Sequence, residues 1–141
     1  KKKINGNISH DVVTRQLLKE NFNEDEIKYI GVTKKDKDEK ELLENRNLQI
    51  YTEADKALKE ISDENPKYLS VDIDVLKKNI APGTGYPDGK YNLDQLKNII
   101  RNTDFRYADL VEVAPPLDEQ NKTVEAAQEI LQCLINSIDT N

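Results

Sequence analysis

The sequence of 141 residues contains no methionine, no tryptophan, one histidine and one cysteine. The single cysteine, Cys133, excludes an intrachain disulfide framework and any zinc site of the CxxC type. No apolar run approaches the ~20 residues of a membrane helix, and nothing at the start resembles a signal peptide, so we expect a cytoplasmic protein with no membrane partner. Because the chain begins at Lys1 and has no methionine, we expect it to be a segment of a longer protein.

Positive charge is also scarce. The chain has 21 lysines and arginines against 27 aspartates and glutamates, and its net charge is -6. A nucleic-acid-binding protein usually presents a basic surface, and this composition argues against one. We therefore expect small molecules or proteins as partners, and no nucleic acid.

Strand and helix patterns alternate along the chain. Apolar residues at helical spacing follow Ser9 and predict a first helix that contains Val12 to Leu18. Further strands are predicted at 28–32, 48–52, 67–74 and 107–114, and further helices at 53–65, 93–102 and 124–138. This order predicts a single α/β domain over residues 1–141, a three-layer αβα fold with a mostly parallel sheet that binds ligands at the carboxyl ends of its strands.

Two aspartates end the strand pattern YLSVDID. In an extended strand Asp72 and Asp74 share one face, roughly 7 Å apart. Two such charges on a covered sheet are unfavourable unless a counter-charge lies between them, and hard carboxylate oxygens suit Mg²⁺ or Mn²⁺. The alternative is that both aspartates lie in water at the end of the strand and cap the following loop.

The loop that follows is unusual in composition. It holds three of the five glycines and two of the five prolines: Gly83, Gly85, Gly89, Pro82 and Pro87. Such a loop directly after a strand requires special backbone geometry and is typical of a functional site. It is not a P-loop, because Lys90 is followed by Tyr91 rather than by serine or threonine.

These residues carry a family resemblance. The segment SVDID…APGTGYP resembles a signature of the ureohydrolases, the superfamily of arginase, agmatinase and formimidoylglutamase. The segments NGNISHD, KYIGVTKKDKDEKELLEN and ADLVEVAPPLD resemble further blocks of that family in the same order. APGTGYP and VEVAPPLD are more similar to agmatinase than to arginase. The resemblance implies that the chain is the C-terminal portion of an arginase-like domain.

The resemblance also implies a mechanism. Asp72 would bridge two Mn²⁺ ions and Asp74 would bind the second, while His10 would relay a proton and Glu112 would bind the guanidinium of the substrate. A hydroxide that bridges the metals would attack a substrate such as agmatine and release urea, a reaction of polyamine metabolism. We expect a homo-oligomer.

Other interpretations of the same residues stay open. His10 lies near a helix start, where it could be a surface capping residue, and Glu112 could be a salt-bridge partner. Cys133 lies among apolar residues of the last helix, which favours a packed core thiol over a nucleophile. The substrate could also be that of an arginase, a guanidino-acid hydrolase or a formimidoylglutamase. A non-catalytic module for subunit interaction, or an unrelated α/β domain with one Mg²⁺, are the remaining hypotheses.

The chain departs from the family pattern in three places. Lys77 and Lys78 replace an Asp-Pro pair, and the family's Pro-Gly-Gly turn is replaced around DGKYN. The chain also lacks the D-x-H-x-D block and the upstream histidine that supply the other metal ligands. We therefore expect residues 1–141 alone to be inactive.

Overall fold

The computed structural model describes residues 13–20, 22–32, 48–51, 53, 56, 58–59 and 67–138. The chain divides into two compact units, residues 1–29 with 34–50, and residues 30–33 with 51–141. His10 and most of the helix expected over 53–65 lie outside the described residues. The assignment of residues 1–141 to a single domain stays a prediction.

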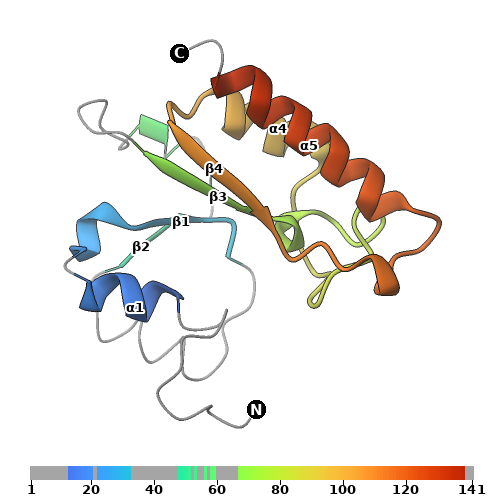
Figure 1. Cartoon of the computed structure of the whole chain (residues 1–141), viewed down its shortest axis with the longest axis horizontal. Helices are drawn as coiled ribbons and strands as arrows, with labels where there is room; N and C mark the ends of the chain where they lie inside the picture. The colour runs from blue at the N-terminus through green and yellow to red at the C-terminus, as the bar shows by residue number, and fades with distance from the viewer. Residues whose placement is uncertain are drawn as a thin grey trace, which may run out of the picture. The chain divides into compact units, whose positions relative to one another are not determined.

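The amino-terminal elements are short. Helix α1 spans Val13–Lys19, strand β1 spans Lys28–Ile30 and strand β2 spans Gln49–Tyr51, and the two strands pair with each other (Figure 1). The predicted strands at 28–32 and 48–52 are thus confirmed, with shorter bounds. Among the described residues, no helix has both the length and the apolar character that a membrane span requires.

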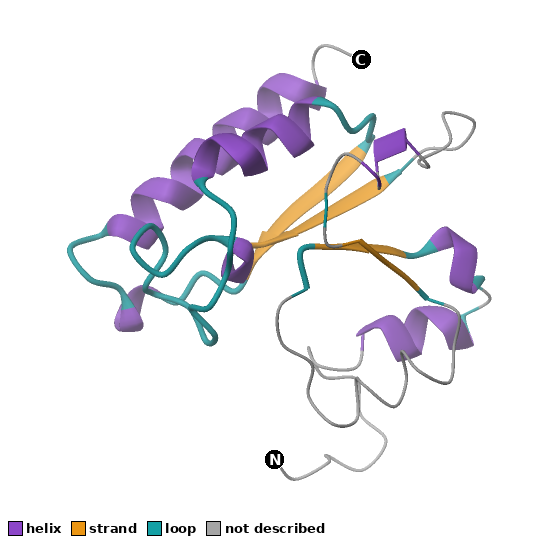
Figure 2. Cartoon of the chain, turned by 180° about the vertical axis from the view of Figure 1, so that it is seen from behind, coloured by secondary structure: helices purple, strands orange, loops and turns teal. Residues whose placement is uncertain are grey.

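The larger unit is built on a parallel strand pair. Strand β3 spans Tyr68–Asp72 and strand β4 spans Tyr107–Val111, and their register places Tyr68 beside Tyr107 and Asp72 beside Val111. Helices α4, Leu93–Arg101, and α5, Lys122–Ile138, lie side by side along one face of this pair (Figures 1 and 2). The parallel pairing expected from the strand–helix alternation is confirmed.

Helix α4 begins at the predicted residue, whereas α5 begins at Lys122, two residues before its predicted start. The Asn92 side chain accepts a hydrogen bond from the backbone N–H of Gln95, and the Gln95 side chain accepts one from the backbone of Asn92, which together form a capping box for α4. The apolar stripes of the helices then meet Val71 and Ile73 in one core. Its members are Val71, Ile73, Leu76, Ala81, Leu96, Ile100, Phe105, Ala126, Ala127, Ile130, Cys133 and Leu134.

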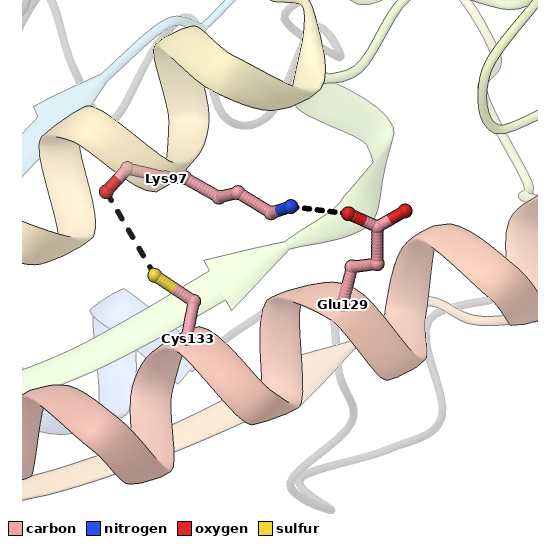
Figure 3. A network of polar contacts seen from close by, with 3 residues as sticks. All are labelled: Lys97, Glu129 and Cys133. Atoms are coloured by element: carbon pink, nitrogen blue, oxygen red, sulfur yellow. Dashed lines mark hydrogen bonds and ion pairs between the residues drawn. The ribbon is translucent and has the colours of Figure 1, made fainter.

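Cys133 belongs to this core, as the sequence predicts. Its thiol is buried and lies 3.9 Å from the backbone oxygen of Lys97 on α4 (Figure 3). One turn earlier on α5, Glu129 forms an ion pair with the Lys97 side chain. The same residue of α4 therefore contacts α5 through both its backbone and its side chain.

The opposite face of the strand pair carries exposed side chains at three positions. Tyr68, Ser70 and Tyr107 point away from the helices and are exposed, and the two tyrosines are 63% and 59% accessible. In the described part of this unit the helices therefore cover one face of the sheet, which is a partial form of the expected three-layer architecture.

Substitutions at two neighbouring residues of α5 show which face of that helix contributes to the stability of the fold. Ile130 is completely buried, whereas Leu131 is 45% exposed. Removing the buried side chain leaves a cavity, so Ile130→Ala should lower the free energy of unfolding by about 2–5 kcal/mol. Leu131→Ala should change it by no more than about 0.5 kcal/mol. Urea denaturation of both variants measures the difference, and equal losses would contradict the packing described here.

Candidate functional site

Three carboxylates gather where β3 and β4 end. Asp72 is the last residue of β3, Asp74 lies in the short 3₁₀ turn Ile73–Val75 that follows, and Glu112 comes directly after β4. Because neighbouring parallel strands end at the same edge of a sheet, these residues lie close enough to influence each other's charge. The structure therefore brings Glu112 to the two aspartates, which precede it by 40 and 38 positions in the sequence.

The local backbone differs from the one predicted. Strand β3 ends at Asp72, two residues early, because the Asp72 carboxylate accepts a hydrogen bond from the backbone N–H of Asp74 at 2.8 Å and starts a turn. The prediction that both aspartates extend from one strand is therefore wrong. Glu112 also lies outside its strand, since β4 ends at Val111 and Glu112 has a φ of 65°, in the left-handed region.

The aspartates are held in an unfavourable environment for negative charge. Burial raises the pKa of Asp72 to about 6, the hydrogen bond from Asp74 opposes this rise, and the charges of Asp74 and Glu112 add to it. The pKa of Asp74 is raised by burial and by the charge of Glu112. The Thr84 hydroxyl and the Tyr86 backbone N–H partly oppose that increase.

The site also contains polar atoms with no partner. Oδ1 of Asp74 and the hydroxyl oxygen of Thr84 are both buried, and neither has a partner at hydrogen-bonding geometry, although the Thr84 hydroxyl lies near enough to Asp74 to lower its pKa. A buried carboxylate oxygen in this state is unstable unless a donor or a cation reaches it. Thr84 itself was not identified from the sequence, although its position between two glycines was a signal.

These features fit part of a metal site. The oxygens of Asp72 and Asp74 are hard ligands that suit Mn²⁺, and the unpaired oxygen of Asp74 has a lone pair to donate to such an ion. Within the residues that the structure describes, no group of three or more histidine, cysteine, aspartate or glutamate side chains is placed to hold a metal ion. The two aspartates can therefore supply only a fraction of a first coordination shell.

The glycine-rich loop folds back over the turn that carries Asp74. Tyr91 donates its backbone N–H to the Val75 oxygen at 3.0 Å, and Lys77 donates to the Tyr91 oxygen at 2.9 Å. A side chain at Gly89 would overlap the backbone of this turn. Gly85 lies opposite Glu112, and a Cβ there would be 3.6 Å from Oε2 of the glutamate. The loop thus touches both parts of the site.

The role of its glycines differs from the expected one. Among the described glycines, Gly31 alone has a φ in the left-handed region. Unusual dihedral angles therefore do not explain Gly83 or Gly89, and the reason for glycine at these two positions is close approach to neighbouring backbone.

The pKa of Asp72 leads to a prediction about metal-free protein. The folded chain binds a proton at Asp72 more tightly than the unfolded chain, so its stability should fall as the pH rises from about 4 through about 6. Allowing for solvent screening, Asp72→Asn should raise the free energy of unfolding by about 1–2 kcal/mol at pH 8, and not at pH 4. Denaturation in the presence of a chelator measures this. The control Asp94→Asn, at the start of α4, should bring no gain, and an equal gain there would contradict the explanation.

Comparison with known proteins finds one family model and several relatives of that same family. A model of the arginase family matches residues 2–136. Putative agmatinase 1 of Schizosaccharomyces pombe is 38% identical over 98 residues, which cover 64% of this chain and 25% of that protein. Guanidinopropionase of Pseudomonas aeruginosa is 47% identical over 57 residues, or 38% of this chain and 18% of that protein.

The fold agrees with the sequence match. The structure of formimidoylglutamase from Bacillus subtilis strain 168 superimposes with a TM-score of 0.72 and 25% identity, over 92% of this chain and 50% of that one. The chain spans no more than half the length of these three relatives. The expected arginase-like α/β fold is confirmed as a partial one, and with a family model that matches residues 2–136, the chain belongs to the arginase family.

Proposed function

We propose that this chain forms part of the active site of a manganese-dependent ureohydrolase that cleaves a guanidinium C–N bond, with agmatine as the preferred substrate. The observation that supports this most is the meeting of Asp72, Asp74 and Glu112 at one end of two parallel strands, with a buried, unpaired oxygen on Asp74. Membership of the arginase family supplies the reaction class.

Each carboxylate has a distinct task in this proposal. Asp72 and Asp74 would hold manganese, which when bound supplies Lewis-acid activation of the attacking water. The Glu112 side chain is exposed, so it is accessible to substrate, and its two oxygens can accept parallel hydrogen bonds from a guanidinium. Glu112 would thus fix the orientation of the carbon that is attacked.

The overall reaction consumes one water molecule. Its oxygen bonds to the guanidinium carbon, the bond from that carbon to the substituted nitrogen breaks, and urea and a primary amine form. The leaving amine needs a proton, and we assign its transfer to His10, which lies outside the described residues. This assignment rests on the family resemblance of NGNISHD.

Two relatives suggest different substrate tails. Agmatine is favoured by the similarity to a putative agmatinase over 98 residues. The higher identity to guanidinopropionase, over 57 residues, makes a guanidino acid the second candidate. Comparing urea release from agmatine, arginine and 3-guanidinopropionate by the natural gene product, supplied with manganese, distinguishes these options.

Residues 1–141 alone should not be catalytic, because Asp72 and Asp74 provide too few ligands to hold a two-metal centre. Purified chain mixed with Mn²⁺ and agmatine should release no urea, and it should retain little metal after gel filtration. Turnover by the isolated chain would show that the assignment of ligands is wrong.

In the natural gene product, variants of Glu112 and Asp74 should lose activity for different reasons. Glu112→Gln removes a charged acceptor for the guanidinium, so kcat/KM for agmatine should fall about 100-fold or more. Its manganese content should be unchanged, because the proposed role is in substrate orientation. Asp74→Ala, the matched variant, should lose at least one metal together with activity. Wild-type turnover by Glu112→Gln would contradict the assigned role.

A further inference from the structure

The peptide groups of Gly83 link three segments of the larger unit. The Gly83 N–H donates a hydrogen bond to Oγ1 of Thr123 on α5 at 2.7 Å. The Gly83 oxygen accepts a hydrogen bond from the N–H of Ala114 at 2.8 Å. Ala114 lies two residues after Glu112, and Thr84 beside Asp74 is the next residue after Gly83. One glycine therefore joins the loop after β3, the segment after β4 and the start of α5.

The Thr123 hydroxyl is held in one orientation by Asp118. It is completely buried, and it donates to Oδ1 of Asp118 at 2.7 Å. Asp118 also accepts hydrogen bonds from the backbone N–H groups of Glu119, Thr123 and Val124. Because the hydroxyl proton is directed to the carboxylate, a lone pair of Oγ1 remains for the Gly83 N–H.

The charged form of Asp118 supports this orientation. Burial of Asp118 opposes its ionisation, but the hydrogen bonds from Thr123, Val124 and Glu119 outweigh that effect and lower its pKa below the ordinary value. The carboxylate is therefore ionised at neutral pH and acts only as an acceptor.

Close packing around Gly83 allows no other residue at this position. A Cβ at Gly83 would lie 2.7 Å from Cα of Asp118 and 2.9 Å from Oγ1 of Thr123. No side chain fits between the loop and the start of α5. The positions of Thr84 and Gly85, and hence their distances from Asp74 and Glu112, depend on this contact.

We propose that Thr123 and Asp118 are positioning residues for the site, which hold Gly83 so that the loop and Glu112 keep a fixed separation. This inference rests on the proposed function, because the separation matters for a guanidinium held between Glu112 and the metal-binding aspartates. Neither residue touches the reacting groups in this proposal. Their effect on the reaction is transmitted through the backbone of Gly83 and Ala114.

Three variants separate positioning from general stability. Thr123→Val keeps the shape of the side chain but removes both hydrogen bonds, whereas Thr123→Ser keeps the hydroxyl. Thr103→Val is the matched control, because Thr103 is also a buried threonine, but its hydroxyl donates to the backbone oxygen of Ile99 at 2.8 Å and not to Asp118. A general loss of stability should be similar for the two valine variants.

The first measurement is amide hydrogen exchange of residues 1–141. Thr123→Val should increase the exchange rates of the Gly83 and Ala114 amides at least tenfold, while β3 amides such as Val71 change no more than they do in Thr103→Val. Thr123→Ser should restore protection. Unchanged exchange at Gly83 in Thr123→Val would overturn the inference, and this result does not depend on any enzymatic activity.

The second measurement is the kinetics of the natural gene product with manganese and agmatine. Thr123→Val should lower kcat/KM at least tenfold with an unchanged manganese content, Thr123→Ser should recover most of that loss, and Thr103→Val should behave as the wild type. If the wild type is active and Thr123→Val is equally active, the positioning role is wrong but the proposed function is not contradicted. A wild type that releases no urea would instead overturn the proposed function, and with it the catalytic consequence of this inference.

Discussion

The parallel register of β3 and β4 is the constraint on which the site depends. Because Asp72 lies beside Val111, the residue after each strand end is fixed relative to its neighbour, and Glu112 comes to the aspartates although it is distant from them in the sequence. Core packing by α4 and α5 maintains that register from one face. The pairing thus brings carboxylates from two distant sequence segments into one group.

The ionised forms of Asp72 and Asp74 are unfavourable when no cation is bound. Burial and like charges raise the pKa values of both aspartates, and Oδ1 of Asp74 has no partner. Similar side chains placed for stability alone would be paired or solvated. The junction of Gly83, Thr123 and Asp118 maintains the loop against these carboxylates, so that a cost in folding free energy is retained where binding of a cation would offset it.

Periodicity was sufficient to predict α4, α5 and the parallel pair, because apolar spacing and core burial agree there. The end of β3 was not predictable by alternation, since the Asp72 side chain competes with the strand ladder by capping a turn. The left-handed backbone of Glu112 and the contact of Gly83 with Thr123, which lie 40 residues apart, leave no local pattern. The family resemblance identified Asp72, Asp74 and Glu112 as candidates, while their chemical roles and that of His10 stay predictions.

The proposed function requires that Asp72 and Asp74 bind metal beside a guanidinium site at Glu112. Anomalous diffraction at the manganese edge, from crystals of the natural gene product carrying Glu112→Gln or the wild-type residue and soaked with Mn²⁺ and agmatine, tests it most directly. We expect anomalous peaks within about 2.0–2.6 Å of carboxylate oxygens of both aspartates, and a guanidinium bound to Glu112 in the wild type. Manganese bound elsewhere, with both aspartates free of metal and the guanidinium away from Glu112, would contradict it.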